Sequence, residues 1–405
     1  HALVFGDSLA AIGWARVTLL GGSMTFPPWT DEHTQLRETV RQFAVNELYP
    51  HRFEWDKDGS FPREVFNKLA DLGVLGIRFP EEHGGLGLDW WYTVAFVEGL
   101  SYCRNAGVMM SVLVDTDMAT PIIAEIGTEE QKAEFLAPVI SGEKVAALGV
   151  TEPGCGSDVA ALRTTARRDG DDYIINGQKT YITNGSIADF ITLAVRTGEE
   201  GHGGISLMLF PTDTPGFHVG RKLDKLGTRS IDSCEIHFED CRIPRRYLLG
   251  HENAGFYYIM TNFQGERLIG SLMGYTGMEH AIQDAINYGK ERSAFGRPIG
   301  KFQVWRHKFA EHITSVAACK ALCMQAVQAI NGEGDPTKLV SMAKLFTGDL
   351  AQKVTYDCLQ IHGGFGFIEE YDICRQYRDV RLLPIGGGTS EVMKEIIWKW
   401  HELGG

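Results

Sequence analysis

The chain contains the stretch FQGERLIGSLMGYTGMEHAIQDA at residues 263–285. Its apolar residues recur at helical spacing, and one face of the helix begins with Glu266 and continues with small or flexible residues. These are Gly270, Met273, Gly274 and Gly277. A glycine in a helix interior costs about 1 kcal/mol relative to alanine. We therefore expect something to approach this strip closely, either a packed helix or a ligand, and the pattern alone leaves both open.

Helical spacing dominates the chain on both sides of a central region. In the first part it predicts helices at residues 30–48, 62–73, 90–102, 119–126 and 129–140. In the last part it predicts long helices at residues 256–291, 299–331, 336–361 and 389–402. Between them lie short runs rich in β-branched and aromatic residues, broken by Gly, Asp, Asn and Pro, which predict strands.

These patterns predict an α+β fold in three domains. We expect an N-terminal α-helical domain at residues 30–144, a middle β-barrel or β-sandwich domain at 145–255, and a C-terminal four-helix bundle at 256–405. Residues 1–29 are interpreted as an N-terminal extension. A cloning remnant is favoured there over a trimmed presequence or a native extension, and the segment is left out of the fold prediction.

The composition narrows the class of protein. A chain of 405 residues can bury large cores, and its formal net charge of -13, with no concentrated basic stripe, argues against nucleic acid as the main partner. Because we find no uninterrupted apolar run of about 18 residues, we expect no membrane insertion. The eight cysteines are scattered, which predicts neither a disulfide framework nor a zinc site and favours a reducing compartment.

Two motifs in the middle region hold residues suited to binding a ligand. TEPGCGSD, at residues 151–158, combines glycines that let a ligand approach the backbone with hydroxyl groups that can bond its polar edges. An ordinary Gly-Pro turn is the alternative. In KTYITNG, at residues 179–185, Tyr181 and Thr183 alternate with Ile182, so an aromatic face and a hydroxyl point the same way from one strand.

Three further motifs lie in the last region. ERSAFGRPIG (291–300) places arginines beside glycine, which suits a phosphate group or an ordinary charged helix end. QIHGGFGF (360–367) ends a helix on paired glycines, and PIGGGTSE (384–391) precedes a final helix that Thr389 can cap. We interpret His362 as structural and expect no metal, because no His, Cys or Asp cluster at metal-ligand spacing accompanies it.

Taken in this order, the five motifs resemble those of the acyl-CoA dehydrogenase family, and the resemblance covers nearly everything after Pro27. It implies a flavoprotein that uses FAD to form an α,β-double bond in an acyl-CoA thioester, as in fatty acid β-oxidation or branched-chain catabolism. It also implies electron-transfer flavoprotein as the electron acceptor and a homotetramer as the assembly. The chain has no GxSxG motif, Walker loop or GxGxxG after a strand to support a hydrolase, P-loop or nicotinamide interpretation.

The resemblance assigns roles to individual residues. The FAD-binding set is Val150, Thr151, Gly156, Ser157, Tyr181, Ile182, Thr183, Arg292, Phe295, Gln303, Gln360, Gly363, Gly364, Thr389 and Glu391. The substrate-binding set is Ser157, Tyr257, Gln264, Arg267, Gly386, Gly387 and Gly388. The first seven of the FAD set would hold the flavin ring. The group from Arg292 to Gly364 would meet the adenine and diphosphate end of a FAD in a neighbouring subunit.

The terminal motif departs from the pattern of many family members, which carry a catalytic glutamate where this chain has Gly387. The branch that resembles long-chain and isovaleryl-CoA dehydrogenases places its base on the long bundle helix, in a Glu-Arg pair, and Glu266 with Arg267 matches that pair. We therefore expect Glu266 to abstract the α-proton while the β-hydride goes to the flavin. The backbone N–H of Gly387 or Gly388 would polarise the thioester carbonyl.

Gly386 stands where straight-chain members commonly have tyrosine, which favours a 3-methyl-branched acyl-CoA of isovaleryl or citronellyl type over long straight chains. Two alternatives stay open: an acyl-CoA oxidase-type flavoenzyme that uses oxygen, and a catalytically silent scaffold of the same fold. We expect a bacterial cytoplasmic location, with the mitochondrial matrix as the alternative.

Overall fold

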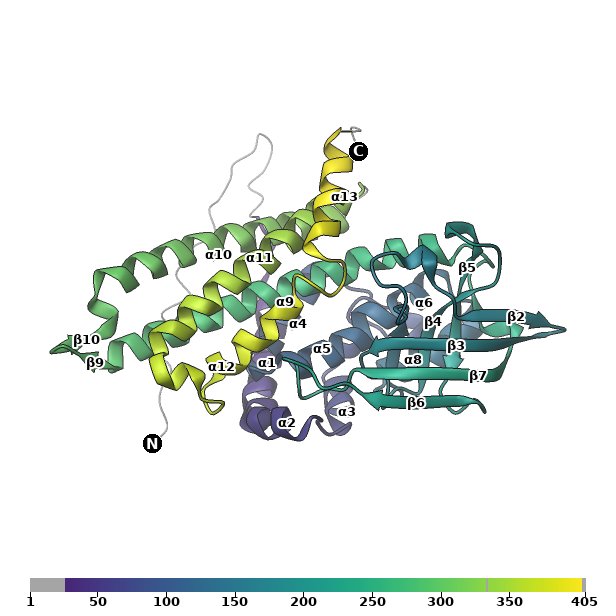
Figure 1. The fold of residues 1–405 in the computed structure, drawn as a ribbon, viewed down its shortest axis with the longest axis horizontal. Helices are drawn as coiled ribbons and strands as arrows, with labels where there is room; N and C mark the ends of the chain where they lie inside the picture. Colours follow the sequence, from purple (N-terminus) through teal and green to yellow (C-terminus); the bar gives the residue numbers. More distant parts are fainter. Residues whose placement is uncertain (1–25, 333, 403–405) are drawn as a thin grey trace.

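The computed structural model describes residues 26–332 and 334–402 (Figure 1). The predicted N-terminal extension, residues 1–29, lies almost wholly outside them. A helical region comes first along the chain, a sheet region next, and a second helical region last, so the predicted α+β class is confirmed. The longest helix, α9 (Gly255–Glu291), contacts elements of all three regions.

The first helical region is built from short helices, several of them joined end to end. Its α-helices are α1 (Asp31–Phe43), α2 (Arg52–Asp58), α3 (Glu64–Asp71), α4 (Trp90–Leu100), α5 (Ala106–Val114), α6 (Pro121–Ile126), α7 (Glu129–Gln131) and α8 (Ala137–Ile140). Short π-helical segments join α5 to α6 and α7 to α8. The sequence patterns missed α5, because its residues are apolar nearly all round and give no amphipathic period; Val108, Val112 and Leu113 are fully buried.

The sheet region contains β1 to β8. The strands are β1 (Ala146–Gly149), β2 (Thr165–Asp169), β3 (Asp172–Ile182), β4 (Phe190–Arg196), β5 (Ile205–Pro211), β6 (Phe217–Lys222), β7 (Cys234–Pro244) and β8 (Leu248–Leu249). They run in the order β6-β7-β3-β2-β4-β5-β8, and β1 pairs in parallel with β4. The sheet has two halves, β6-β7-β3-β2 and β4-β5-β8, and one register pair, Thr165 with Arg196, joins them. Phe210 of β5 packs on Phe238 of β7 with ring centroids 4.9 Å apart, so the halves enclose a common apolar core.

The last region consists of three long helices and two shorter ones. After α9 come the short strands β9 (Ser293–Ala294) and β10 (Arg297–Pro298), then α10 (Gln303–Ile330), α11 (Thr337–His362), α12 (Asp372–Asp379) and α13 (Ser390–Glu402). α9, α10 and α11 pack on one another, while α13 packs on α11 and projects beyond the bundle (Figure 1). The sequence patterns missed α12, because it is held by ion pairs such as Arg375 with Asp372 rather than by an apolar stripe.

Among residues 26–332 and 334–402, two helical stretches are long and apolar enough to cross a membrane by length and composition alone. They are Ala106–Ile126 and Gln303–Ile330. The most apolar window of the first is 83% buried inside the protein, as expected for a core helix, and that of the second is 33% buried. The expectation that no segment inserts into a membrane therefore stays a prediction.

Candidate active site

Glu266 lies about three turns from the start of α9 and is half-buried. Its Oε2 atom is buried and has no hydrogen-bond partner among the described residues. Burial raises the pKa of this carboxyl from 4.5 to about 7, and the opposing positive charges of Arg267 and Lys344 offset only part of that rise. A carboxyl with a pKa near neutrality is suited to accept a proton from a weak carbon acid.

A glycine loop lies directly beside this carboxyl. A Cβ atom on Gly387 would lie 3.3 Å from Glu266 Oε1. Gly387 and Gly388 both have positive φ angles, of 65° and 103°, which L side chains rarely adopt. The backbone conformation and the position of the carboxyl thus explain why the loop carries glycine.

Two buried cations hold the glycine loop in place. Arg267 Nε donates a hydrogen bond to the carbonyl of Gly387 over 3.3 Å, and Lys344 Nζ donates one to the carbonyl of Gly388. In a trans peptide the C=O of one residue and the N–H of the next point in opposite directions. Fixing these carbonyls therefore directs the following N–H groups away from the cations. In the part of the chain that the structure describes, the N–H groups of Gly387 and Gly388 have no acceptor.

The glycine strip of α9 serves both of the purposes that the sequence left open. A Cβ on Gly274 would lie 2.3 Å from Thr347 Cγ2 of α11, so this glycine is required by helix packing. A Cβ on Gly270 or Gly277 would meet nothing within 4 Å. The side of α9 that carries Glu266 therefore faces open space at Gly270 and Gly277, while the side at Gly274 packs against protein.

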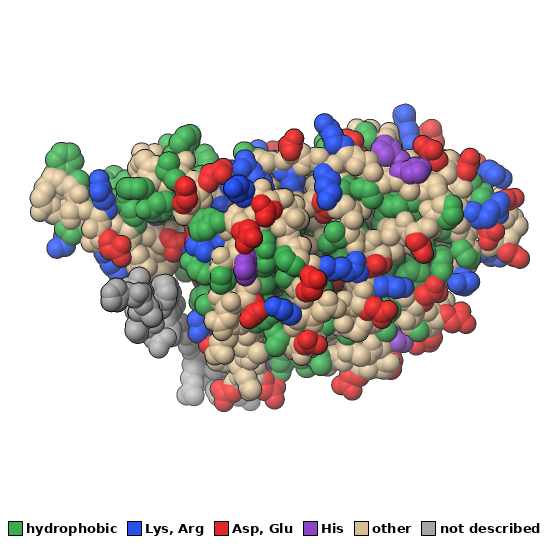
Figure 2. Space-filling model, turned by 90° about the horizontal axis from the view of Figure 1, so that it is seen from below, with side chains coloured by type: hydrophobic (Ala, Val, Ile, Leu, Met, Phe, Trp, Pro, Cys, Tyr) green, Lys and Arg blue, Asp and Glu red, His purple; other side chains and the backbone are tan. Residues whose placement is uncertain are grey.

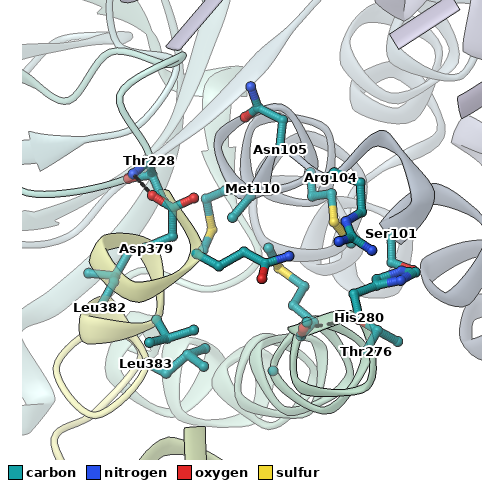
Figure 3. A pocket seen from close by; sticks show the side chains of 17 residues that line it. Ser101, Arg104, Asn105, Met110, Thr228, Thr276, His280, Asp379, Leu382 and Leu383 are labelled. Carbon is teal, nitrogen blue, oxygen red and sulfur yellow. Dashed lines mark hydrogen bonds between the residues drawn. The ribbon is translucent and has the colours of Figure 1, made fainter. Parts of the chain in front are cut away.

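A pocket continues along the same face of α9 (Figure 3). It holds about 700 Å³ of empty space between α5, α9, α12 and residues 380–383. Its apolar lining includes Met109, Met110, Met273, Leu382 and Leu383. The rise of about 1.5 Å per helical residue places Gly277, on the pocket wall, about 16 Å beyond Glu266 along the axis.

The predicted flavin-ring residues come from two adjacent segments of the sheet region. The N–H of Thr180 donates to the carbonyl of Thr151 over 2.9 Å, which brings the loop after β1 next to the end of β3. Buried Lys179 fixes this loop by donating to the carbonyl of Val150 over 3.0 Å and to Glu152 Oε1 over 2.8 Å. The residues assigned to the ring by resemblance, Val150 to Ser157 and Tyr181 to Thr183, therefore lie together.

This surface fits a flat ring. Tyr181 is 68% exposed and has a φ of 60°, which L residues other than glycine seldom adopt. A Cβ on Gly154 would meet nothing within 4 Å, and one on Gly156 would meet only Thr151 at 3.9 Å. The packing of the chain itself does not require these glycines, so close approach by a bound group is the physical reason that fits them.

The residues predicted to meet the adenine and diphosphate lie elsewhere. Arg292, Phe295 and Gln303 surround the β9–β10 hairpin, and Gln360 to Gly364 end the adjacent α11. Arg292 lies about 39 Å beyond Glu266 along α9. Figure 2 shows hydrophobic side chains gathered at this end of the bundle, where Phe295 is 96% exposed. One chain does not bring these residues to its own flavin-ring surface, and their service to a neighbouring subunit stays a prediction.

Four other predicted site residues lie at the start of α9, along it, or at the start of α13. Tyr257 is 64% exposed near the start of α9, and Gln264 Nε2 donates to Thr337 Oγ1 over 3.1 Å. Thr389 Oγ1 accepts from the N–H of Val392 over 3.3 Å and so caps α13, as the sequence suggested. Glu391 is an exposed residue in the first turn of α13.

Sequence reasoning missed Lys344, whose side chain is buried beside the glycine loop. The signal was present: Val340, Lys344, Thr347 and Ala351 share one face of α11, and all four are buried. A lysine on an otherwise uncharged buried face requires a partner. Burial lowers the pKa of Lys344 to about 8, with Glu266 among the groups that oppose the change. Arg267 and Lys344 thus place two cationic side chains on the glycine loop, close enough to Glu266 to lower the pKa of its carboxyl.

The chain is similar to known proteins over most of its length. The chain matches family models described as the N-terminal, middle and C-terminal domains of acyl-CoA dehydrogenase, over residues 30–143, 147–241 and 253–401. It is 39% identical to the long-chain specific acyl-CoA dehydrogenase of Sus scrofa, over 91% of this chain and 86% of that protein. It is 37% identical to the short-chain specific enzyme of Bos taurus, over 95% and 93%. A crystal structure of a probable acyl-CoA dehydrogenase from Mycobacterium abscessus matches with a TM-score of 0.89 and 41% identity, over 91% of this chain and 98% of that one.

Proposed function

Because the chain belongs to the acyl-CoA dehydrogenase family, it is a FAD-dependent oxidoreductase that acts on CH–CH bonds of acyl-CoA, and we propose that Glu266 is its catalytic base. The observation that carries this proposal is a buried carboxyl with a pKa of about 7 beside a loop with free N–H donors. When bound, FAD supplies the acceptor for the hydride that leaves the β-carbon.

The protein groups have distinct tasks in this proposal. Glu266 takes the α-proton, and the carboxyl is poised for it because burial has removed the water that would favour its charged form. Arg267 and Lys344 hold the carbonyls of Gly387 and Gly388, and the first of these contacts orients the N–H of Gly388. This N–H, together with the unbonded N–H of Gly387, can bond the thioester oxygen as negative charge develops there. This places the base on the long bundle helix, as in the long-chain and isovaleryl-like branch that the sequence resembles.

The pocket supports an acyl group longer than isovaleryl. An extended chain advances about 1.2 Å per bond, so the distance of about 16 Å from Glu266 to Gly277 corresponds to about 13 bonds. A Cβ atom on Gly386 would lie 3.4 Å from Leu382 Cδ1, its nearest neighbour, so glycine leaves space on the loop. We therefore propose a 3-methyl-branched acyl-CoA of citronellyl type, or a long-chain acyl-CoA, as the substrate. Identities of 39% to a long-chain and 37% to a short-chain enzyme do not decide the matter.

Anaerobic titration of the purified holoenzyme tests this function. The visible flavin absorbance would be followed after adding isovaleryl-, citronellyl-, butyryl-, dodecanoyl- and hexadecanoyl-CoA. The proposal expects bleaching, fastest with citronellyl-CoA or the long chains. Bound flavin that no thioester bleaches would overturn it and favour a silent scaffold. Fastest bleaching by butyryl-CoA would overturn the substrate proposal alone.

The same preparation tests the remaining assignments. Repeating the turnover in air measures peroxide, and a stoichiometric yield would favour the oxidase-type alternative over transfer to electron-transfer flavoprotein. Sedimentation of the holoenzyme tests the proposed homotetramer, which is expected because the residues near the β9–β10 hairpin lie far from their own chain's flavin-ring surface. A monomer with tightly bound FAD would contradict it.

A further inference from the structure

The pocket beside α9 is lined by both apolar and polar side chains (Figure 3). Leu382 and Leu383, which lead into the glycine loop, form an apolar wall together with Met273. The wall made by residues 101–105 and α12 carries polar side chains. Its side chains are Ser101, Arg104, Asn105, Gln376 and Asp379. An acyl chain that runs along α9 into this pocket would meet both apolar and polar side chains.

Most of the polar side chains on the wall made by residues 101–105 and α12 are already bonded within the protein. Asn105 Oδ1 accepts from Ser230 Oγ over 2.6 Å, and Asp379 Oδ1 accepts from the N–H of Thr228 over 2.6 Å. Arg104 forms an ion pair with Asp284. These contacts explain why those residues are polar without any ligand.

Gln376 differs from its neighbours. Its Oε1 atom is buried without a hydrogen-bond partner, and its side-chain nitrogen has none either among the residues that the structure describes. A buried amide oxygen without a partner is unfavourable, whereas leucine would fill a similar volume at this apolar pocket without that cost. Arg104 Nε, on the same wall, is also buried and unbonded. The wall thus offers both an acceptor and a donor that the protein does not use.

We infer, on the basis of the proposed function, that the acyl substrate carries a hydroxyl group on its distal part and that Gln376 binds it. A hydroxyl both donates and accepts, so it can satisfy either end of the amide. Arg104 and Asp379 give this wall one positive and one negative side chain, so its charge does not select a carboxylate or an ammonium group over a neutral hydroxyl. From Met273 to His280 the pocket runs about 10 to 21 Å beyond Glu266, which corresponds to about 9 to 17 bonds along an extended chain.

The first test is equilibrium binding without turnover. The holoenzyme would be titrated with two unreactive thioethers, S-dodecyl-CoA and S-(12-hydroxydodecyl)-CoA, and with a hexadecyl pair. The inference expects at least one hydroxylated compound to bind about tenfold more tightly than its plain partner. Gln376→Leu should abolish that ratio, whereas Met110→Leu, which changes the shape of the pocket but not its polarity, should keep it.

Each outcome is decisive. Equal or weaker binding of both hydroxylated compounds to the wild-type protein overturns the inference, even if Gln376→Leu does not fold. A preference that survives Gln376→Leu assigns the hydroxyl to another group and overturns the role of Gln376. If the hydroxylated thioethers bind no more tightly than the plain ones, but the plain thioesters bleach the flavin, the dehydrogenase proposal stands although the inference fails. If no thioether binds and no thioester bleaches, both fail.

Discussion

Replacing Glu266 with glutamine should stabilise the protein at alkaline pH and leave its stability nearly unchanged in acid. The folded state raises the pKa of this carboxyl from 4.5 to about 7 because of burial. Between these two pH values the folded protein binds more protons at this site than the unfolded chain does. The stability that Glu266 contributes therefore falls as the pH rises through this window.

The size of the pKa change sets the size of the expected stability difference. Each pKa unit corresponds to about 1.4 kcal/mol, so an interval from 4.5 to about 7 gives a cost of at most about 3 kcal/mol at pH 8. Glutamine has nearly the same shape and no charge. Glu266→Gln should therefore gain up to about 3 kcal/mol over the wild type at pH 8, and the gain should fade toward pH 4.5.

Urea unfolding of the two holoenzymes, followed by tryptophan fluorescence from pH 4.5 to pH 8, measures this difference. The comparison at pH 4.5, where both side chains are neutral, removes any effect of the amide itself. Glu291→Gln, at the exposed end of the same helix, controls for the loss of one surface carboxylate. A difference that does not change with pH would refute the reasoning, and so would a variant that becomes less stable above pH 7.

Substitutions at three further positions test the surroundings of the base. Gly274→Ala places a methyl group 2.3 Å from Thr347 Cγ2 and should destabilise the protein by about 1–3 kcal/mol in urea unfolding. Gly270→Ala meets nothing within 4 Å, so it should stabilise α9 by about 1 kcal/mol; destabilisation would show that the open space is needed for packing. Lys344→Met removes a positive charge that lowers the pKa of Glu266, so the acid limb of the bleaching rate should move to higher pH, and Lys344→Arg should keep it in place. An unchanged limb in the methionine variant would exclude this role.

Local patterns predicted the main elements but not how they meet. The amphipathic helices and the β-rich middle region were visible because one face of each is apolar and the other polar. α5 escaped notice because it is buried on all sides; the cap that Asn105 provides to the N–H groups of Gly107 and Val108 was the signal that could have revealed it. α12 escaped because buried ion pairs, such as Arg378 with Asp56, replace an apolar stripe.

The candidate site was predictable only in part, because local patterns do not show which distant elements meet. The terminal motif located the glycine loop, and the Glu-Arg pair in the stretch 263–285 located Glu266, because both patterns can be read from consecutive residues. Lys344 and the pocket wall at Gln376 depend on contacts between elements distant in sequence. Whether a glycine of α9 faces a helix or open space also depends on the neighbouring elements, as the contrast between Gly270 and Gly274 shows.

The most direct test of the central claim is the anaerobic rate of flavin bleaching in Glu266→Gln, mixed rapidly with the best thioester. The variant should keep its bound FAD and its affinity for the matching thioether, because glutamine preserves the shape of the site. Loss of the base should slow bleaching by about a hundredfold or more relative to the wild type. A rate within tenfold of the wild type would contradict the account and show that another group removes the α-proton.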